Sequence, residues 1–418
     1  MADRIARIGL TLGADICWPI CFESLLQQLS LDLRIGRDRV RFECDRVMIE
    51  PVDLRQPVKY DVAIDRLTHW YWLSREWIKK AIILDYLYVY NNPWSLQSNE
   101  KHTVYCAMMQ LGLAIPDTWL LPPKTYYPAE DLESTLRKYA RLFSLDEIGD
   151  RVSYPAFLKP DHGGGWQGIS KVGDAHELHR AYDENGTEVM NLQRAMLPYE
   201  RFVRCIGLGP QLRIVNYDPT APLHDRYRMD TDFLDPADAA VLGDTTLTIN
   251  AFFGWDFNFC EALRKDHLWH PIDFANACPH SQVTSLHYHF PWLIKANLRW
   301  SIFCAATGRK MRKNMEWEPF IAIADSDRSQ AEKLAAYAAI AHERFETDRF
   351  RDFCRKHLGH LDEFAYGFFG SETMHDAIRQ NVAAIFPTHE VDEFTELSWS
   401  RVQDWRAREG AHGDQDLR

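Results

Sequence analysis

The sequence lacks the features that would place it in several common classes of protein. It has no run of about 18 or more uncharged apolar residues, so we expect no membrane span. Basic residues are not in excess, since 48 Lys and Arg stand against 60 Asp and Glu, for a net charge of −12. General binders of nucleic acid or of anionic membranes need a positive field, so we expect neither partner. The glycine-rich stretch at 163–168 lacks a following GK[ST], which excludes a Walker-type phosphate loop.

The cysteine pattern argues against a disulfide-rich protein and against a cysteine-based zinc site. The nine cysteines are an odd number scattered singly, and most stand in apolar or helical patterns, which favours buried reduced thiols over disulfides. Cys17 and Cys21 have helical spacing, but no second pair stands where a zinc site would need one. The first residues lack an apolar region closed by a small-residue cleavage site, so they read as a buried strand. We therefore expect a cytoplasmic protein.

What is present is the composition of a sizeable globular protein. The 418 residues are 46% hydrophobic and 26% charged, which suits two or three domains. The pattern up to residue 90 predicts a strand at 5–13, a helix at 17–29, extended segments at 40–52 and 60–64, a helix at 77–87 and a strand at 88–90. Alternation of this kind is typical of a small open α/β domain with a parallel sheet.

The pattern changes twice further along the chain. A helix at about 98–111 ends at Gly112, and from 155 to 279 we expect many short strands with a single helix near 174–183. Beyond residue 290, helical periodicity covers 291–311, 328–345, 348–358 and 371–385. These last helices could cover the active site, form a homodimer interface or bind a partner, and the sequence does not choose between these roles.

The strongest chemical motif begins on an apolar strand, PAFLKP, that presents a single lysine. A glycine-rich connection, DHGGGWQGI, leads from it into a second strand, SKV. Lys159 would supply a charge for the α- and β-phosphates of a nucleotide. Backbone N–H groups would approach phosphate oxygens at Gly163, Gly164, Gly165 and Gly168. The alternative is a flexible β-hairpin turn without a ligand.

Downstream, a strand, a short connector and a second strand follow one another. The connector begins at Gln193 beside the apolar residues 195–197, and Glu200 lies seven residues on. A strand edge with free backbone groups suits adenine, and a carboxylate can accept hydrogen bonds from both ribose hydroxyls. Taken alone, the segment is equally a hairpin with a surface glutamate.

Acidic residues mark the next pair of strands, around 255–263 and 268–274. Glu261 and Asp273 fall near facing positions, and Asn276 follows at the sheet edge. Two carboxylates and an amide oxygen form a hard ligand set that suits Mg²⁺, with Mn²⁺ as an alternative ion. Carboxylates buried on apolar strands need partners, and a metal ion would provide one.

These three motifs, in this order and with these gaps, resemble the ATP-grasp superfamily. The resemblance covers roughly residues 5–285 and is greatest to the carboxylate–amine ligases, which include D-alanine–D-alanine ligase, glutathione synthetase and the RimK-type ligases. It implies a mixed α/β (α+β) ATP-grasp fold. An N-terminal open parallel α/β domain would span 1–97, a two-lobed ATP-binding region 98–289 and a helical extension 290–418.

The resemblance also implies a role for each motif. Lys101, on the helix that follows NNPWSLQSNE, would be the first lysine on the ATP phosphates and Lys159 the second, beneath the glycine loop. Adenine and ribose would lie against Gln193, the backbone of Arg194 and Met196, and Glu200. The metal ion would lie against Glu261, Asp273 and Asn276.

One departure from the family pattern concerns an arginine. Phe259 stands where the family often has an arginine that holds the reacting oxyanion, so another group must take that role. Five arginines lie between the proposed hinge and the metal strands: Arg201, Arg204, Arg213, Arg226 and Arg228. Guanidinium forks bind phosphate and carboxylate in bidentate fashion. We favour Arg213 and Arg228, with ordinary surface or ion-pair arginines as the alternative.

The resemblance implies an ATP- and Mg²⁺-dependent ligase that activates a small carboxylate as an acyl phosphate and joins it to an amine, releasing ADP and phosphate. Two alternatives remain open. One is a non-catalytic ATP-binding protein that regulates or recruits a partner, and the other is an ATP-grasp phosphotransferase. A further motif, HSQVTSLHYH, carries His280, His287 and His289 but lacks matching acidic or cysteine ligands. We expect it to form a turn and a short strand rather than a metal site.

Overall fold

The computed structural model describes residues 3–48, 50–68, 71–95, 100–162, 168–276 and 278–410. Its contacts divide the chain into two compact units. The first unit combines Met1–Gln97, Val203–Phe259 and Ala277–Arg418, and the second combines Ser98–Phe202 and Cys260–Asn276. The predicted division at residues 97 and 289 stays a prediction.

The first unit contains a five-stranded sheet in the order β2-β3-β1-β4-β5. Its strands are β1 (Asp3–Thr11), β2 (Asp32–Ile35), β3 (Asp38–Arg46), β4 (Val62–Asp65) and β5 (Tyr88–Tyr90). β1 pairs in parallel with both β3 and β4, and β4 with β5, whereas β2 forms an antiparallel edge. β1 and β4 are buried along most of their length, as is typical of the inner strands of a parallel sheet. The predicted open parallel sheet is therefore confirmed, with one antiparallel edge strand.

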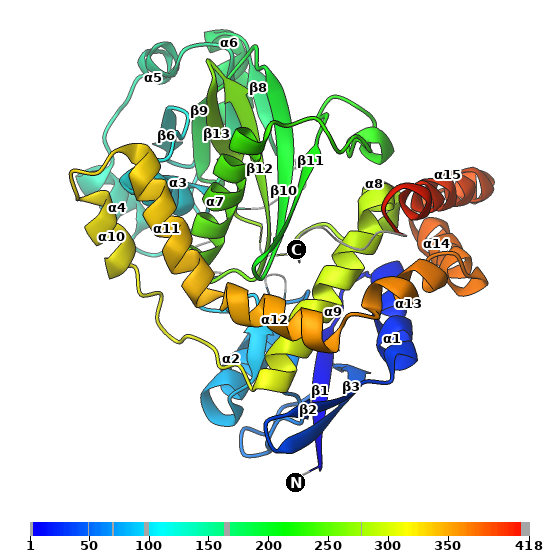
Figure 1. Ribbon diagram of the computed structural model, residues 1–418. Coiled ribbons are helices and arrows are strands. Elements are labelled where there is room, and N and C mark those ends of the chain that lie inside the picture. Colours follow the sequence, from blue (N-terminus) through cyan, green and yellow to red (C-terminus); the bar gives the residue numbers. More distant parts are fainter. Residues whose placement is uncertain are drawn as a thin grey trace. The chain divides into compact units, whose positions relative to one another are not determined.

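Helices make up most of the rest of the first unit. Those before residue 290 are α1 (Cys17–Leu29), α2 (Trp72–Asp85), α7 (Pro236–Phe253) and α8 (Val283–Leu286). Those after it are α9 (Phe290–Thr307), α10 (Glu318–Ala324), α11 (Gln330–Arg344), α12 (Thr347–His357), α13 (Leu361–Phe368), α14 (Glu372–Ile385) and α15 (Val391–Trp405). Short 3-10 turns occupy Leu223–Asp225, His287–His289 and Thr388–Glu390, and a π-helical turn occupies Arg406–Gly410. α9 is buried on all sides, and α11 packs along α7 (Figure 1).

The second unit contains a four-stranded antiparallel sheet in the order β6-β9-β7-β8. Its strands are β6 (Thr118–Leu121), β7 (Ala156–Pro160), β8 (Ser170–Val172) and β9 (Met190–Arg194). Its helices are α3 (Lys101–Gln110), α4 (Leu132–Tyr139), α5 (Leu145–Val152) and α6 (Ala175–Glu184). Residues of α5 and α6 pack on the apolar face of this sheet and form one buried cluster with it. The opposite face is left for polar side chains.

Two antiparallel hairpins complete the fold. In the first unit, β10 (Arg201–Leu208) pairs with β11 (Gln211–Asn216) from Val203 onward. In the second unit, β12 (Phe257–Lys265) pairs with β13 (Leu268–Asp273) from Glu261 onward, with an irregularity between Glu261 and Ala262. β10 and β12 each run from one compact unit into the other. The chain is thus a mixed α/β protein, as the sequence predicted.

Two expectations about local structure are wrong. The region 155–279 contains a second helix, the 18-residue α7, in addition to the predicted one. The segment from His280 to His289 forms α8 and a 3-10 turn instead of a short strand. All nine cysteines are free and six of them are buried, but Cys106, which was expected to be buried, is exposed. Among the described residues, no helix is long and apolar enough to cross a membrane.

Candidate functional site

Lys159 lies at the centre of the polar side of the second unit. It stands on β7, its side chain is buried, and its Nζ donates a hydrogen bond of 2.8 Å to Gln193 Oε1 on β9. Burial lowers the pKa of Lys159 from 10.5 to about 8, while the negative charge of Asp273 opposes this shift and the positive charge of Lys101 adds to it. A buried cation held at such a cost is poised to gain from an anionic ligand.

Helix α3 brings two further residues to the same place. Lys101, its first residue, is buried and its charge acts on Lys159. Tyr105, one turn later, donates a hydrogen bond of 2.9 Å from its hydroxyl to the backbone oxygen of Ile272, next to Asp273. Burial and the charge of Asp273 raise the pKa of Tyr105 well above its usual range. The two predicted phosphate lysines and one predicted metal ligand therefore interact within a single compact unit.

The predicted metal ligands lie on the β12–β13 hairpin. Glu261 and Asp273 are directly paired across the two strands, as the sequence predicted, and Asn276 follows three residues after β13 ends. Glu261 is 5% exposed and Asp273 is partly exposed. Two carboxylates and an amide oxygen beside two lysines form a donor set that fits Mg²⁺ only if negative phosphate oxygens complete the site. The residues therefore fit a metal–nucleotide pair better than a metal ion alone.

The predicted adenine connector starts slightly later than expected. Gln193 lies within β9, where its Oε1 faces Lys159 and its Nε2 donates to Thr118 Oγ1 at 2.8 Å. The backbone N–H of Arg194 is engaged with the oxygen of Asp117 at 2.9 Å. Within the described part of the chain, Met196 has no backbone hydrogen bond, so its N–H and C=O can pair with an adenine edge.

Glu200 stands at the end of this connector, against the β12–β13 turn. Its Oε1 accepts the backbone N–H of His267 at 3.0 Å, and its Oε2 lies 3.5 Å from Arg264 Nε. Its own N–H donates to the oxygen of Arg264 at 2.7 Å. The carboxylate is exposed and retains lone pairs for hydroxyl donors, so its predicted ribose role stays a prediction.

Of the four glycines predicted for the phosphate loop, the structure describes Gly168. Gly163, Gly164 and Gly165 lie outside the described residues. Gly168 adopts φ of +69°, in the left-handed region, and a Cβ there would approach Pro160 Cγ to 3.3 Å. Glycine adopts this left-handed conformation without steric cost, so the backbone just before β8 favours glycine at this position.

The two arginines predicted for the oxyanion lie in the first unit and are both paired. Arg213, on β11, forms two hydrogen bonds of 2.7 Å with the carboxylate of Glu409, near the C-terminal end of the described chain. Arg228 lies 2.6 Å from Asp218. Of the other candidates, Arg204 stacks on the ring of Tyr217 at 4.2 Å. The oxyanion role of Arg213 and Arg228 stays a prediction.

His289 connects these two arginines. Its Nδ1 accepts from Arg213 Nε at 3.2 Å, and its Nε2 lies 2.8 Å from the backbone oxygen of Arg228. This requires the neutral tautomer with its proton on Nε2. Burial, followed by the charge of Arg213, lowers its pKa to about 3, and burial likewise lowers the pKa of His280 to about 4. The low pKa values keep both imidazoles neutral at neutral pH.

Sequence reasoning missed three residues that shape the site. Tyr105 supports the end of β13, and Thr118 and Asn191 orient the side chains of Gln193 and Asp161. The spacing of Lys101 and Tyr105, four residues apart on a predicted helix, was a signal for the first of these. The other two depend on the register of β6, β7 and β9, which the sequence does not reveal.

Comparison with known proteins finds similarity only among solved structures. No protein-family model and no curated protein matches the chain. A RimK-domain ATP-grasp protein from Sphaerobacter thermophilus is 12% identical with a TM-score of 0.45, covering 66% of this chain and 92% of its own. The VanG D-Ala:D-Ser ligase from Enterococcus faecalis is 12% identical with a TM-score of 0.45, covering 81% of this chain and 100% of its own. D-Alanine–D-alanine ligase from Bacillus anthracis complexed with ATP is 14% identical with a TM-score of 0.45, covering 72% of this chain and 97% of its own.

Proposed function

We propose that this chain is an ATP-grasp ligase that joins a small carboxylate to an amine, with release of ADP and phosphate. The observation that carries the proposal is the buried Lys159, whose charge interacts with Lys101 and Asp273 in one unit. Two buried lysines beside a pair of carboxylates offer cationic contacts for phosphate oxygens and oxygen ligands for a metal ion. The order and spacing of the sequence motifs support the same proposal.

The residues of the chain would divide the work as follows. Lys101 and Lys159 bind phosphate oxygens, and the pKa of Lys159 rises again because a nearby anion favours the charged lysine. The backbone of Met196 and the carboxylate of Glu200 bind adenine and ribose. Glu261, Asp273 and Asn276 would hold Mg²⁺, which neutralises phosphate charge when bound. Positioning and charge stabilisation account for the catalysis, because no protein nucleophile is required.

The reaction then proceeds in two steps. An oxygen of the substrate carboxylate attacks the γ-phosphorus, the bond from that phosphorus to the β–γ bridging oxygen breaks, and ADP leaves. The amine of the second substrate attacks the carbonyl carbon of the acyl phosphate, loses a proton, and displaces phosphate to leave an amide. Arginines Arg213 and Arg228 are the proposed donors to the developing oxyanion. For Arg213 this requires release of Glu409, since both bonds of its fork are occupied.

The test is turnover of ATP by the full chain. Purified protein with ATP, Mg²⁺ and pooled amino acids should release ADP and phosphate in equal amounts. Lys159→Ala should abolish the release, whereas Lys171→Ala, which removes an exposed lysine of the neighbouring strand, should leave it unchanged. ATP binding that survives Lys159→Ala unaltered would show that the assignment of the site is wrong.

Two other functions make different predictions in the same assay. A phosphotransferase would yield a phosphorylated product in place of free phosphate. A non-catalytic regulatory protein would bind ATP without turnover in any substrate pool. Together with the ligase we propose small-molecule substrates, no nucleic-acid partner and a cytoplasmic location. The identity of the acid and the amine would come from the products.

A further inference from the structure

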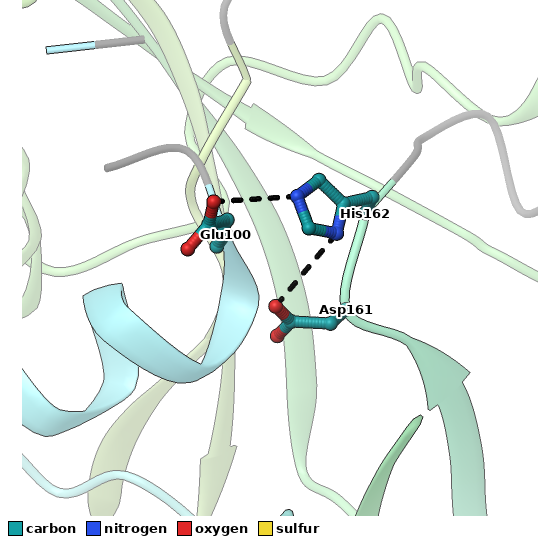
Figure 2. A group of neighbouring side chains, drawn as sticks. All are labelled: Glu100, Asp161 and His162. Carbon is teal, nitrogen blue, oxygen red and sulfur yellow. Dashed lines mark ion pairs between the residues drawn. The ribbon is translucent and has the colours of Figure 1, made fainter. Parts of the chain in front are cut away.

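A second group of ligand-type side chains lies beside the proposed nucleotide site, yet belongs to none of its motifs. It consists of Glu100, Asp161 and His162, whose ligand atoms all lie within 4.8 Å of one another (Figure 2). Glu100 precedes the first residue of α3, and Asp161 and His162 directly follow β7. The group therefore joins two segments that are sixty residues apart in the sequence but lie in the same unit.

Asp161 is held in one orientation by residues outside the group. Its side chain is 7% exposed, and its Oδ1 accepts hydrogen bonds from the backbone of His102 at 2.9 Å and from Asn191 Nδ2 at 2.8 Å. The other oxygen, Oδ2, faces His162 and accepts no hydrogen bond from any residue that the structure describes. Fixing one oxygen while exposing the other is how proteins orient a metal-binding carboxylate.

The charges of the group are not balanced by the protein. Across the described ranges, neither carboxylate has a Lys or Arg within 4.0 Å, and His162 is the ion-pair partner of both. Its Nε2 lies 3.3 Å from Glu100 Oε1, and its Nδ1 lies 3.9 Å from Asp161 Oδ2. A neutral imidazole carries one proton, so it can donate to only one of the two carboxylates. Asp161 is also held by His102 and Asn191 at its other oxygen, whereas Glu100, with a side chain that is 39% exposed, faces His162 and solvent.

The spacing of the ligand atoms suits a small divalent cation. Around a tetrahedral ion with ligands at about 2.0–2.1 Å, neighbouring ligand atoms lie about 3.4 Å apart. The 3.3 Å between His162 Nε2 and Glu100 Oε1 matches this value. Asp161 Oδ2 faces the other ring nitrogen, Nδ1, at 3.9 Å, so the exposed imidazole would have to turn for one nitrogen to share an ion with both carboxylates. Two carboxylates and one imidazole form a set of the kind that binds Zn²⁺, whereas Mg²⁺ prefers oxygen ligands alone.

We propose that Glu100, Asp161 and His162 bind one transition-metal cation of the zinc type. The ion fastens the start of α3 to the end of β7, the two segments that carry the lysines Lys101 and Lys159. Three protein ligands leave a fourth position open for water or another small ligand. The site is separate from the Mg²⁺ ligands proposed above, and it does not depend on the ligase activity.

The experiment uses the full chain, stripped of metal by a chelator and free of nucleotide. Zn²⁺ is titrated by calorimetry, and Co²⁺ is titrated as a spectroscopic probe of coordination geometry. We expect one ion per chain with tetrahedral Co²⁺ bands in the visible spectrum. His162→Gln and Glu100→Gln should each weaken binding by on the order of 100-fold, since each removes a direct ligand. The His162 side chain is 68% exposed and that of Glu100 is 39% exposed, so the variants should fold, which circular dichroism verifies.

Two matched variants separate this site from the alternatives. His179→Gln removes a similar exposed histidine that faces a single carboxylate, Asp146, at 3.0 Å, and it should leave binding unchanged. Glu261→Gln should also leave Zn²⁺ binding unchanged, even if the proposed nucleotide site is wrong. The proposal is overturned if the wild type binds no Zn²⁺, if His162→Gln binds as tightly as the wild type, or if Glu261→Gln is the variant that loses the ion.

Discussion

The buried positive charge of Lys159 should lower the free energy of unfolding of the protein. The pKa of Lys159 falls from 10.5 to about 8 on folding, chiefly through burial. At about 1.4 kcal/mol for each pH unit, the difference corresponds to about 3 kcal/mol. The unfolded chain binds the proton more tightly, so the free energy of unfolding should rise by this amount as pH increases from about 8 to 10.5. Below pH 8 the whole cost is present.

The assay is the free energy of unfolding by urea, followed by tryptophan fluorescence, between pH 7 and 10.5. Tyrosines and thiols also titrate in this range, so the informative quantity is the difference between wild type and Lys159→Met. That difference should rise by about 3 kcal/mol in favour of the wild type across the interval. At pH 7 two effects on the free energy of unfolding of Lys159→Met oppose each other. Removal of the buried charge stabilises the variant, whereas Gln193 Oε1, left without its donor, destabilises it by about 1–3 kcal/mol.

Lys171→Met is the control, because Lys171 is exposed on the adjacent strand and its difference curve should be flat. ATP provides a second readout. A bound triphosphate stabilises the charged lysine, so ATP affinity should fall as pH rises through about 8 in the wild type. A flat difference curve for Lys159→Met would refute the reasoning, since it would mean that the lysine is not held in a buried, charge-disfavouring place.

Three further predictions concern other parts of the molecule. Tyr105→Phe removes the hydroxyl that donates to the backbone oxygen of Ile272, so it should destabilise the protein by about 1–2 kcal/mol in urea unfolding. Because Asp273 is the next residue, the variant should also raise the Kd for Mg²⁺–ATP. An unchanged Kd would contradict the supporting role of Tyr105. The pKa of His289 lies near 3, so the free energy of unfolding should fall by about 5 kcal/mol as pH drops from 6.5 towards 3. His289→Gln should lose less stability over the same acid titration. Gly168→Ala should lower the Tm by the equivalent of about 1–2 kcal/mol. The control Gly367→Ala, in a helix with open space around the added Cβ, should not lower the Tm. Equal Tm values for the two variants would show that the backbone at residue 168 does not need a left-handed residue.

Regular elements with a clear period could be predicted well from the sequence. The bounds of α1 were predicted to the residue, since its buried side chains recur with helical spacing from Cys17 to Leu26. The strands β1, β4 and β5 followed from short apolar runs bounded by polar residues. By contrast, α7 was missed because its second half is buried all round and rich in threonine, so it has no amphipathic stripe to reveal it.

The HSQVTSLHYH segment was misjudged for a related reason. Alternation of His287 and His289 imitates the two-residue period of a strand, but burial against α15 selects a helical turn. Tertiary packing overrides local pattern in such short segments.

The predicted site shows the same division between local and long-range information. The approach of Glu261 to Asp273 could be predicted because a short hairpin fixes its own register. Their direct pairing could not, since it depends on the irregularity between Glu261 and Ala262. The contact between Lys159 and Gln193 could not, since it depends on pairing between strands that are more than thirty residues apart. The hydrogen bonds between Arg213 and Glu409 join residues almost two hundred positions apart, so no local sequence pattern predicts them.

The central claim is that Lys101 and Lys159 form the phosphate site of a nucleotide-binding unit. The most direct measurement is the Kd for ATP with Mg²⁺, determined by calorimetry for wild type, Lys101→Met, Lys159→Met and the control Lys171→Met. We predict that the wild type and Lys171→Met bind ATP equally well and that each of the other two variants binds at least about tenfold more weakly, since each loses a charge-assisted contact worth roughly 1.5–3 kcal/mol. Equal ATP affinity in all four proteins, or no ATP binding by the wild type, would contradict the claim.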